Sequence, residues 1–294
     1  MREDSTLDID DELRIVRRAF AKKILAKADV VEPSLEDAFA NVLREDFLPP
    51  GPWPIFQPSG AYQNTPSADP VYLYTDDLVG IVPKRQLNNG QPALHAELLS
   101  LAGIRAGDHV VHIGAGAGYY SAIMAELVGS DGRVTAVEFD PDLAKTAAGN
   151  LSGRANVRVL QGDGSVVAFD PADVIYVNAG ATRPADNWLD RLKPGGRLML
   201  PLTTDKSSAQ VFAAIDRHGA VFRIVRAHDG FLARWVSAVA IYPCEGMRDA
   251  VSERALAAAF EQGGWERVTR LLRRDDVPSD RCWVRAPGWC LTYD

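Results

Sequence analysis

The sequence predicts an α/β protein whose core is a mostly parallel sheet with helices on both faces. From residue 108 onwards, short apolar runs alternate with helical segments, which is the pattern of consecutive βαβ units. The first apolar run leads into a turn with glycine at every second position, Gly114, Gly116 and Gly118, and then into a helix. A glycine-rich turn between a strand and a helix is typical of nucleotide-binding folds.

The bulk composition is that of an ordinary globular protein. The 294 residues are 47% hydrophobic and 24% charged, which suits one large α/β domain with additions or two small domains. The net charge of −7 argues against nucleic acid as a partner, because proteins that bind duplex phosphates usually have a basic face. The acidic N-terminus lacks the features of a signal peptide, and no run approaches the roughly 18 apolar residues of a membrane span. We therefore expect a cytoplasmic protein that binds neither nucleic acid nor membranes.

The cysteines and histidines show no metal-ligand spacing. Cys244, Cys282 and Cys290 form an odd, sparse set without a CxxC pair, so we expect reduced thiols rather than a disulfide framework or a zinc site. The histidines are scattered along the chain, and no metal is expected.

We assign residues 1–107 to an N-terminal region. Apolar residues at three- and four-residue steps predict one helix over 10–28 and a second from about 34 to 44. A third helix is expected after Pro92.

A proline-rich stretch interrupts this region. Residues 49–70 contain seven prolines, which leave almost no room for regular structure, so a long ordered loop is expected. Residues 71–83 then look strand-like.

Residues 108–243 are predicted to form the nucleotide-binding core. The expected strands are 109–114, 133–139, 157–162, 173–178 and 196–202. The expected helices between them are 119–128, 141–151 and 185–192. Short gaps within residues 210–244 then predict antiparallel strands joined by turns.

Residues 244–294 are assigned to a C-terminal α/β extension. We expect a helix over 252–264, a second short helix near 265–273, and a terminal hairpin about Pro287-Gly288.

The residues around the glycine turn favour S-adenosylmethionine over NAD. The dinucleotide fingerprint G-x-G-x-x-G would place its third glycine at Tyr119, whereas here Gly118 comes one residue early. Glu138 ends the second strand, where a carboxylate can accept both hydroxyls of a ribose; the alternative is a solvated charge at a strand end. Asp163 follows the third strand and lies at the same edge, where an adenine amino group needs an acceptor.

Residues 35–243 resemble the protein-L-isoaspartate O-methyltransferase family, a group of class I S-adenosylmethionine-dependent methyltransferases. The resemblance implies a Rossmann-like seven-stranded sheet whose last strands include an antiparallel pair. It rests on the order of these motifs: "AFANVLREDFLP", "YTDD", "GQPALHA", "VVHIGAGAGYYSAIMAELVG", "VTAVEFD", "NVRVLQGDG", "ADVIYVNAGATRPADNWLDRLKPGGRLMLPL" and "AIYPC".

The resemblance also implies roles for individual residues. The glycine turn would line the methionine part of the cofactor, Glu138 would bind the ribose, and Asp163 with Gly164 the adenine. The segment "NNGQPALHA" would close over the cofactor, with His95 touching it; the alternative for His95 is a helix residue bonded to a neighbouring carbonyl. His112 stands where the family usually has an acidic residue, and we expect it to be a structural hydrogen-bonding residue. The cofactor-binding candidates are Gly90, His95, Gly114, Ala115, Gly116, Gly118, Tyr119, Glu138, Phe139, Asp163 and Gly164.

The substrate side departs from the family. Where the family has Thr-Ile-Ser, with the serine at the substrate carboxylate, this chain has Asn88-Asn89-Gly90 and no hydroxyl. The substrate-side candidates are Asn88, Asn89 and Asn178; for Asn178 the alternative is an amide that caps a strand end. We name no catalytic residue, because a carboxylate acceptor is ionised at pH 7 and needs no general base.

The predicted function is methyl transfer from S-adenosylmethionine to a carboxylate of a protein, a peptide or a small molecule. One alternative is a small-molecule O- or N-methyltransferase with a rebuilt substrate pocket. Another is a cofactor-binding module without turnover. A NAD-dependent oxidoreductase ranks last because the third glycine comes early.

Overall fold

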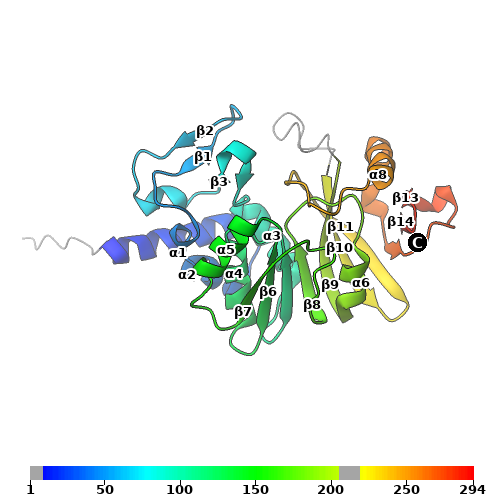
Figure 1. Ribbon diagram of the computed structural model, residues 1–294, viewed down its shortest axis with the longest axis horizontal. Helices are drawn as coiled ribbons and strands as arrows, with labels where there is room; N and C mark the ends of the chain where they lie inside the picture. The colour runs from blue at the N-terminus through cyan, green and yellow to red at the C-terminus, as the bar shows by residue number, and fades with distance from the viewer. Residues whose placement is uncertain (1–8, 205–218) are drawn as a thin grey trace, which may run out of the picture. The chain divides into compact units, whose positions relative to one another are not determined.

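The computed structural model describes residues 9–204 and 219–294. The chain divides into two compact units, Met1–Ser100 and Leu101–Asp294 (Figure 1).

The first unit begins with two packed helices. α1 spans Ile9–Lys27 and α2 spans Pro33–Asn41, and the rings of Phe20 and Phe39 meet edge to face at 6.5 Å between centroids. Both predicted helices are therefore confirmed, although α2 ends before the predicted residue 44 and a short 3-10 turn, Glu45–Phe47, follows it. α3, Pro92–Ala102, begins at the predicted proline.

The proline-rich stretch contains a β-hairpin, so the expectation of a loop without regular structure is wrong. β1 (Pro54–Phe56) pairs antiparallel with β2 (Tyr62–Asn64), and the rings of Phe56 and Tyr62 pack at 5.1 Å. Proline is tolerated here because Pro54 is the first residue of its strand.

The strand-like stretch 71–83 is only partly a strand. It opens with a 3-10 helix, Pro70–Leu73, and regains extended structure at β3, Gly80–Val82, which pairs with β4, Leu87–Asn88. Leu73 and Val79 are buried with Trp53, so burial rather than strand pairing decides this segment.

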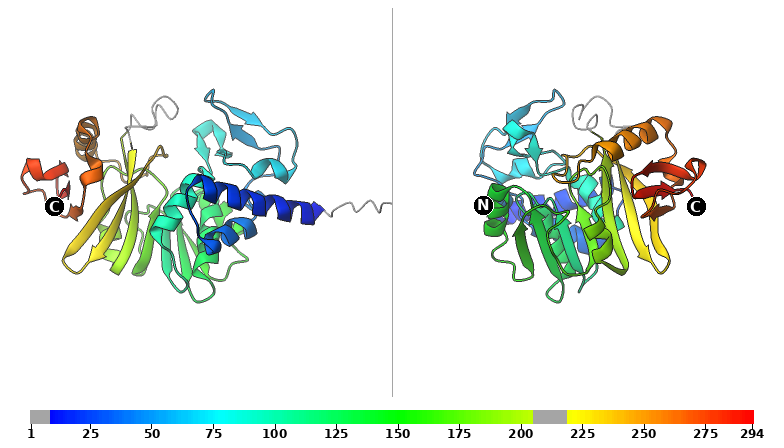
Figure 2. Two further views of the ribbon diagram at one scale, coloured as in Figure 1. Left: turned by 180° about the vertical axis from the view of Figure 1, so that it is seen from behind. Right: turned by 45° about the vertical axis from the view of Figure 1, so that its right-hand side comes forward.

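The second unit is built on one large sheet (Figures 1 and 2). Its first five strands run parallel, and the antiparallel pair β10–β11 follows, so the seven predicted strands are present. Residues 210–218 of the predicted antiparallel segment lie outside the described residues. In spatial order the seven strands are β7 (Val157–Gln161), β6 (Arg133–Glu138), β5 (His109–Ile113), β8 (Ala172–Val177), β9 (Leu192–Thr203), β10 (Gly219–Ala227) and β11 (Gly230–Ala238).

Helices cover both faces of the parallel strands, as predicted. The helices of this part are α4 (Tyr119–Val128), α5 (Pro141–Asn150) and α6 (Asp186–Arg191). Val111 and Ile113 of β5 belong to the buried cluster that contains Trp188 of α6. The residue between them, His112, contacts Ser121 of α4. Because side chains alternate along a strand, α4 and α6 lie on opposite faces.

The C-terminal extension continues the same sheet. α8 (Ala250–Gln262) precedes β12 (Arg270–Leu272), β13 (Cys282–Ala286) and β14 (Trp289–Thr292), which extend the sheet beyond β11 to ten strands. The terminal hairpin about Pro287-Gly288 is confirmed. The predicted helix near 265–273 is wrong: a 3-10 turn, Trp265–Arg267, leads into β12, because buried Leu271 pairs with Phe231 of β11.

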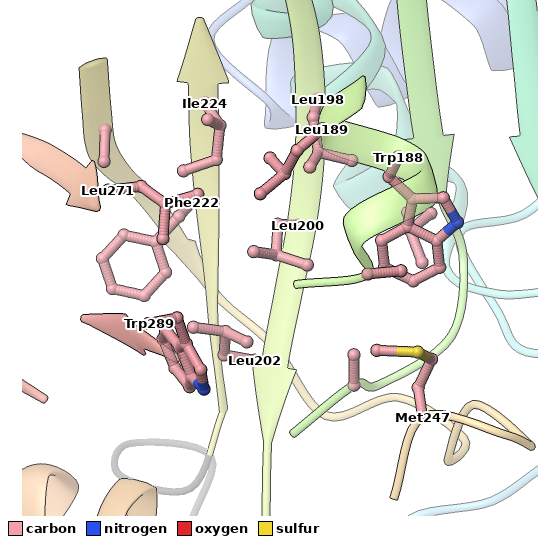
Figure 3. Close-up of a cluster of buried hydrophobic side chains, with 14 of the residues drawn as sticks. Trp188, Leu189, Leu198, Leu200, Leu202, Phe222, Ile224, Met247, Leu271 and Trp289 are labelled. Atoms are coloured by element: carbon pink, nitrogen blue, oxygen red, sulfur yellow. The ribbon is translucent and has the colours of Figure 1, made fainter. Parts of the chain in front are cut away.

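A large apolar cluster joins the extension to the core (Figure 3). Leu198, Leu200 and Leu202 of β9 pack with Phe222 of β10 and Trp289 of β14. Burial of this many large side chains supplies the main stabilisation of the second unit.

Candidate functional site

The glycine turn lies at the carboxyl end of β5. Gly114, Gly116 and Gly118 have φ angles of +78°, +56° and +99°, the left-handed region that favours glycine. A Cβ on Gly114 would lie 3.0 Å from the backbone oxygen of Asn178. The turn therefore needs glycine for its conformation and, at Gly114, for its close approach to the loop after β8.

Glu138 connects the end of β6 to the glycine turn. One carboxylate oxygen accepts the backbone N–H of Gly116 at 2.7 Å, and the other accepts the N–H of Asp140 at 3.0 Å. The residue is only 8% exposed, so the alternative of a solvated strand-end charge is wrong. Burial raises the pKa of Glu138, and the hydrogen bonds from Asp140 and Gly116 oppose that shift.

Asp163 lies on the loop after β7. Its Oδ1 accepts both the backbone N–H of Ser165 at 2.8 Å and its hydroxyl at 2.7 Å. A Cβ on Gly164 would lie 2.4 Å from a methyl carbon of Ile113, and the carbonyl of Gly164 accepts the indole N–H of Trp188 at 2.8 Å. The loop is thus packed against the end of β5, and Asp163 shares the carboxyl edge with Glu138.

The remaining candidates of this unit differ in exposure. Ala115 and Tyr119 are buried next to the glycines, whereas Phe139 is 48% exposed beside Glu138. An exposed aromatic ring next to a buried carboxylate offers a flat apolar surface to a ligand.

Asn178 ties the ends of β5 and β8 together. Its backbone N–H donates to the carbonyl of Ile113 at 2.8 Å, and its side-chain amide donates to the carbonyl of Gly114 at 3.5 Å. These contacts correspond to the strand-end alternative considered for this residue, and its role toward a substrate stays a prediction.

His112 is a buried structural residue, as expected. Its Nδ1 lies 2.8 Å from the hydroxyl of Ser121, and its ring meets Tyr176 edge to face at 5.7 Å. Complete burial lowers the pKa of His112 to about 3, so the imidazole is neutral at physiological pH.

The segment 88–95 belongs to the first unit and is folded around His95. Gly90 has a φ of +74°, and a Cβ there would lie 2.3 Å from Nε2 of His95, whose side chain is buried. The side-chain oxygen of Asn88 accepts the N–H of Gly90 at 2.9 Å, and that of Asn89 accepts the N–H of Val79 at 3.1 Å. The amides of Asn88 and Asn89 therefore shape the segment; their contact with a substrate stays a prediction.

Sequence reasoning missed the residue that fixes the start of α3. Asp76 accepts the N–H of Ala93 at 2.7 Å and the amide of Gln91 at 3.0 Å, and it pairs with Lys27 at 2.7 Å. An acceptor at a helix N-terminus satisfies a backbone donor that has no partner within the helix. No local pattern indicates this cap, since Asp76 is far from Pro92 in sequence.

Within residues 9–204 and 219–294, no group of three or more His, Cys, Asp or Glu side chains could hold a metal ion. No helix in the same ranges is both long and apolar enough to cross a membrane.

Comparison with known proteins identifies the family. Residues 18–231 match the family Protein-L-isoaspartate(D-aspartate) O-methyltransferase, which is well over half of the chain. The chain belongs to this family. It is therefore a methyltransferase that uses S-adenosylmethionine as its methyl donor.

Individual relatives agree with the family match. A protein-L-isoaspartate O-methyltransferase of Ignicoccus hospitalis is 29% identical over 236 residues, which cover 77% of this chain and 96% of that protein. Several further relatives of the same name match over only about half of their own length.

Two solved structures establish the fold. One, a protein-L-isoaspartate O-methyltransferase, aligns with a TM-score of 0.65 at 24% identity, covering 81% of this chain and 69% of its own. The other, from Plasmodium falciparum and in complex with S-adenosyl-L-homocysteine, aligns with a TM-score of 0.59 at 16% identity. The alignment covers 78% of this chain and 98% of that chain. The family match ends at residue 231, so the segment after β11 lies outside it.

Proposed function

We propose that this protein methylates a carboxylate oxygen of an aspartyl or isoaspartyl residue in a peptide or protein, with S-adenosylmethionine as the donor. Membership of the isoaspartyl methyltransferase family supports the reaction class. The observation that carries the proposal is the position of Glu138, whose carboxylate is bonded to the glycine turn at the carboxyl edge of the sheet.

The residues at this edge fit the cofactor. The left-handed glycines present backbone without a Cβ, which suits the close approach of a ligand. A carboxylate has about four acceptor positions, so Glu138 can still accept ribose hydroxyls beside its two backbone donors. Asp163 would accept the adenine amino group, and Phe139 would contact the ring. When bound, the cofactor supplies an electrophilic methyl group on a sulfonium.

Methylation of a carboxylate requires little proton transfer by the side chains of the protein. A carboxylate acceptor is already ionised at pH 7, so no general base is needed. The chain must bind the two substrates in line and exclude water from them. Asn88, Asn89 and Asn178 remain our candidates for donors to the acceptor carboxylate.

A small-molecule acceptor is the second candidate. The observation that favours it is the segment Asn88-Asn89-Gly90, which replaces the hydroxyl-bearing residue of the family and packs Gly90 against His95. A Cβ at Gly90 would collide with that ring, so a serine cannot be restored there without rearrangement.

The test is a methyl-transfer assay with paired peptides. The purified protein is incubated with methyl-labelled S-adenosylmethionine and an isoaspartyl peptide, beside the same peptide with a normal aspartyl residue. Base-labile label on either peptide supports carboxylate methylation, and label on the isoaspartyl form alone defines repair specificity. Tight cofactor binding without label on any peptide would reject the peptide acceptor in favour of a small molecule or a module without turnover.

A further inference from the structure

Strands β10 and β11 present two different faces. Phe222 and Ile224 of β10 and Ala233 of β11 belong to the large buried cluster (Figure 3). Because side chains alternate along a strand, Arg223 and Arg234 lie on the opposite face. In the left view of Figure 2, no described helix of the second unit lies in front of these two strands. We call this side of β10 and β11 the outer face.

Four neighbouring strands each place an arginine on the outer face. Arg223 and Arg234 stand directly opposite each other in the register of β10 and β11. The register of the sheet also places Arg197 of β9 and Arg270 of β12 on this face. Like charges in directly opposite positions of a sheet repel each other. The pair Arg223 and Arg234 therefore costs stability unless an anion compensates it.

Carboxylates compensate the two flanking arginines but not the central pair. Arg197 donates to Asp108 at 2.9 Å, and Arg270 donates to Asp229 at 3.0 Å. Within residues 9–204 and 219–294, neither Arg223 nor Arg234 has a hydrogen-bond acceptor or a carboxylate partner. The Nε atom of Arg223 is buried and has no acceptor. The central pair is thus an uncompensated positive charge between two compensated ones.

The uncompensated charge of Arg223 carries a desolvation cost. The side chain is half-buried, and burial lowers the pKa of Arg223, as do the charges of Arg197 and Arg234. A guanidinium that leaves water without meeting an anion is unfavourable. Proteins keep such locally unfavourable groups mainly where a function requires them. The central pair therefore has the properties of a site whose anion comes from another molecule.

Apolar side chains adjoin the central pair on the outer face. Val225 and Leu232 are the next register partners along β10 and β11, and Leu232 is 44% exposed. A free inorganic anion would use only the two charges, whereas a peptide with acidic and apolar side chains would use the charges and the apolar surface. The net charge of −7 gives no general attraction for an acidic chain, so its affinity would come from this patch.

We propose that Arg223 and Arg234, with Val225 and Leu232 beside them, form a docking site for an acidic segment of a partner protein. Its carboxylates would accept charge-assisted hydrogen bonds from both guanidinium groups, which suit the two oxygens of a carboxylate. Binding would also remove the repulsion between the two arginines. The site goes beyond the methyl transfer proposed above, because it lies on the strands and not at the carboxyl edge that carries Glu138.

The test compares two labelled peptides by fluorescence anisotropy. One peptide has four glutamates among apolar residues, and the other has glutamines in their place. We expect the wild type to bind the glutamate peptide about tenfold or more tightly, because each carboxylate forms charge-assisted hydrogen bonds. Arg223→Met and Arg234→Gln should each remove most of this difference. The control is Arg158→Gln, which removes an exposed arginine of β7 and should bind both peptides like the wild type.

A charge reversal separates docking from a structural role of the arginines. Arg234→Glu places a carboxylate opposite Arg223, and a cross-strand pair of opposite charges stabilises a sheet. We therefore expect this variant to unfold at a higher urea concentration than the wild type and to lose its preference for the glutamate peptide. If the arginines served only the fold, the variant would instead unfold at a lower urea concentration.

Four binding results would overturn the inference. Equal affinity of the wild type for both peptides rejects an acidic partner, and an equal loss in Arg158→Gln shows that the attraction is not specific to the outer face. Displacement of the glutamate peptide by inorganic phosphate at matched ionic strength would assign the arginines to a small free anion. A dimer that dissociates in Arg234→Glu would assign the outer face to a second copy of this chain. None of these measurements involves the cofactor, so the methyl-transfer assay judges the proposed function separately.

Discussion

The carboxylate of Glu138 accepts the backbone N–H of Gly116 at 2.7 Å, so the end of β6 and the glycine turn after β5 form one hydrogen-bonded structure. A buried carboxylate is thereby placed beside glycine backbone that has no side chain. This relationship leads to the first three predictions.

Glu138→Gln should weaken S-adenosylmethionine binding by about tenfold or more. Glutamine offers one carbonyl oxygen, so the N–H groups of Gly116 and Asp140 cannot both keep their acceptors. The ribose hydroxyls also lose a charged acceptor. Calorimetric titration measures the effect. The control is Glu126→Gln, which removes only an ion pair with Arg154 and should bind like the wild type. Equal affinities in all three proteins would contradict the ribose assignment.

Cofactor affinity should fall as the pH is lowered toward the pKa of Glu138. Burial raises that pKa above its ordinary value of 4.5, and ribose hydroxyls donate best to the ionised carboxylate. Protonation therefore competes with binding at a higher pH than for an exposed glutamate. Titrations at several pH values should show this loss in the wild type and not in Glu138→Gln. A wild-type affinity that stays constant down to pH 4.5 would be inconsistent with it.

Gly116→Asp should abolish S-adenosylmethionine binding. The φ of +56° is one that Asp and Asn tolerate, so the fold should survive. The new carboxylate would stand next to Glu138 and occupy the space that we assign to the cofactor. Gly116→Asn has a side chain of the same shape without the charge and should still bind S-adenosylmethionine, but more weakly than the wild type. The difference between the two variants separates charge repulsion from steric bulk. Unchanged affinity in Gly116→Asp would refute the cofactor assignment.

His112 should make the protein sensitive to acid. Its pKa falls from about 6.5 in the unfolded chain to about 3 in the fold, so the unfolded state binds more protons between those values. Stability is therefore lost as the pH falls from 6.5 toward 3. Between pH 7 and pH 5, the free energy of unfolding measured in urea should fall by about 2 kcal/mol less for His112→Asn than for the wild type. Equal losses would mean that His112 already carries its charge in the fold.

The core of the fold and the placement of the candidate site residues at one edge of the sheet were predictable because their signals are local. Each parallel strand is an apolar run in the sequence, and the carboxyl ends of parallel strands lie at one edge of the sheet. Glu138 and Asp163 follow two neighbouring strands, so they lie at the same edge whatever the conformation of the loops. The glycine turn follows from three glycines at alternate positions, since only glycine takes these φ angles freely.

The missed features depend on contacts between distant residues. Leu271 is in a strand rather than a helix because it pairs with Phe231, and Asp76 caps a helix that begins well beyond it. The approach of Gly246 to Asp163 joins positions on opposite sides of the antiparallel strands. Nothing in the local pattern around any of these residues indicates its partner.

The most direct test of the account is methyl transfer to a carboxylate by the wild type beside Glu138→Gln, at a cofactor concentration that saturates the wild type only. The account predicts a base-labile methyl ester on the acceptor peptide with the wild type and a marked loss with the variant, recovered in part when the cofactor concentration is raised. Transfer at the same rate by both proteins, or base-stable label, would contradict it.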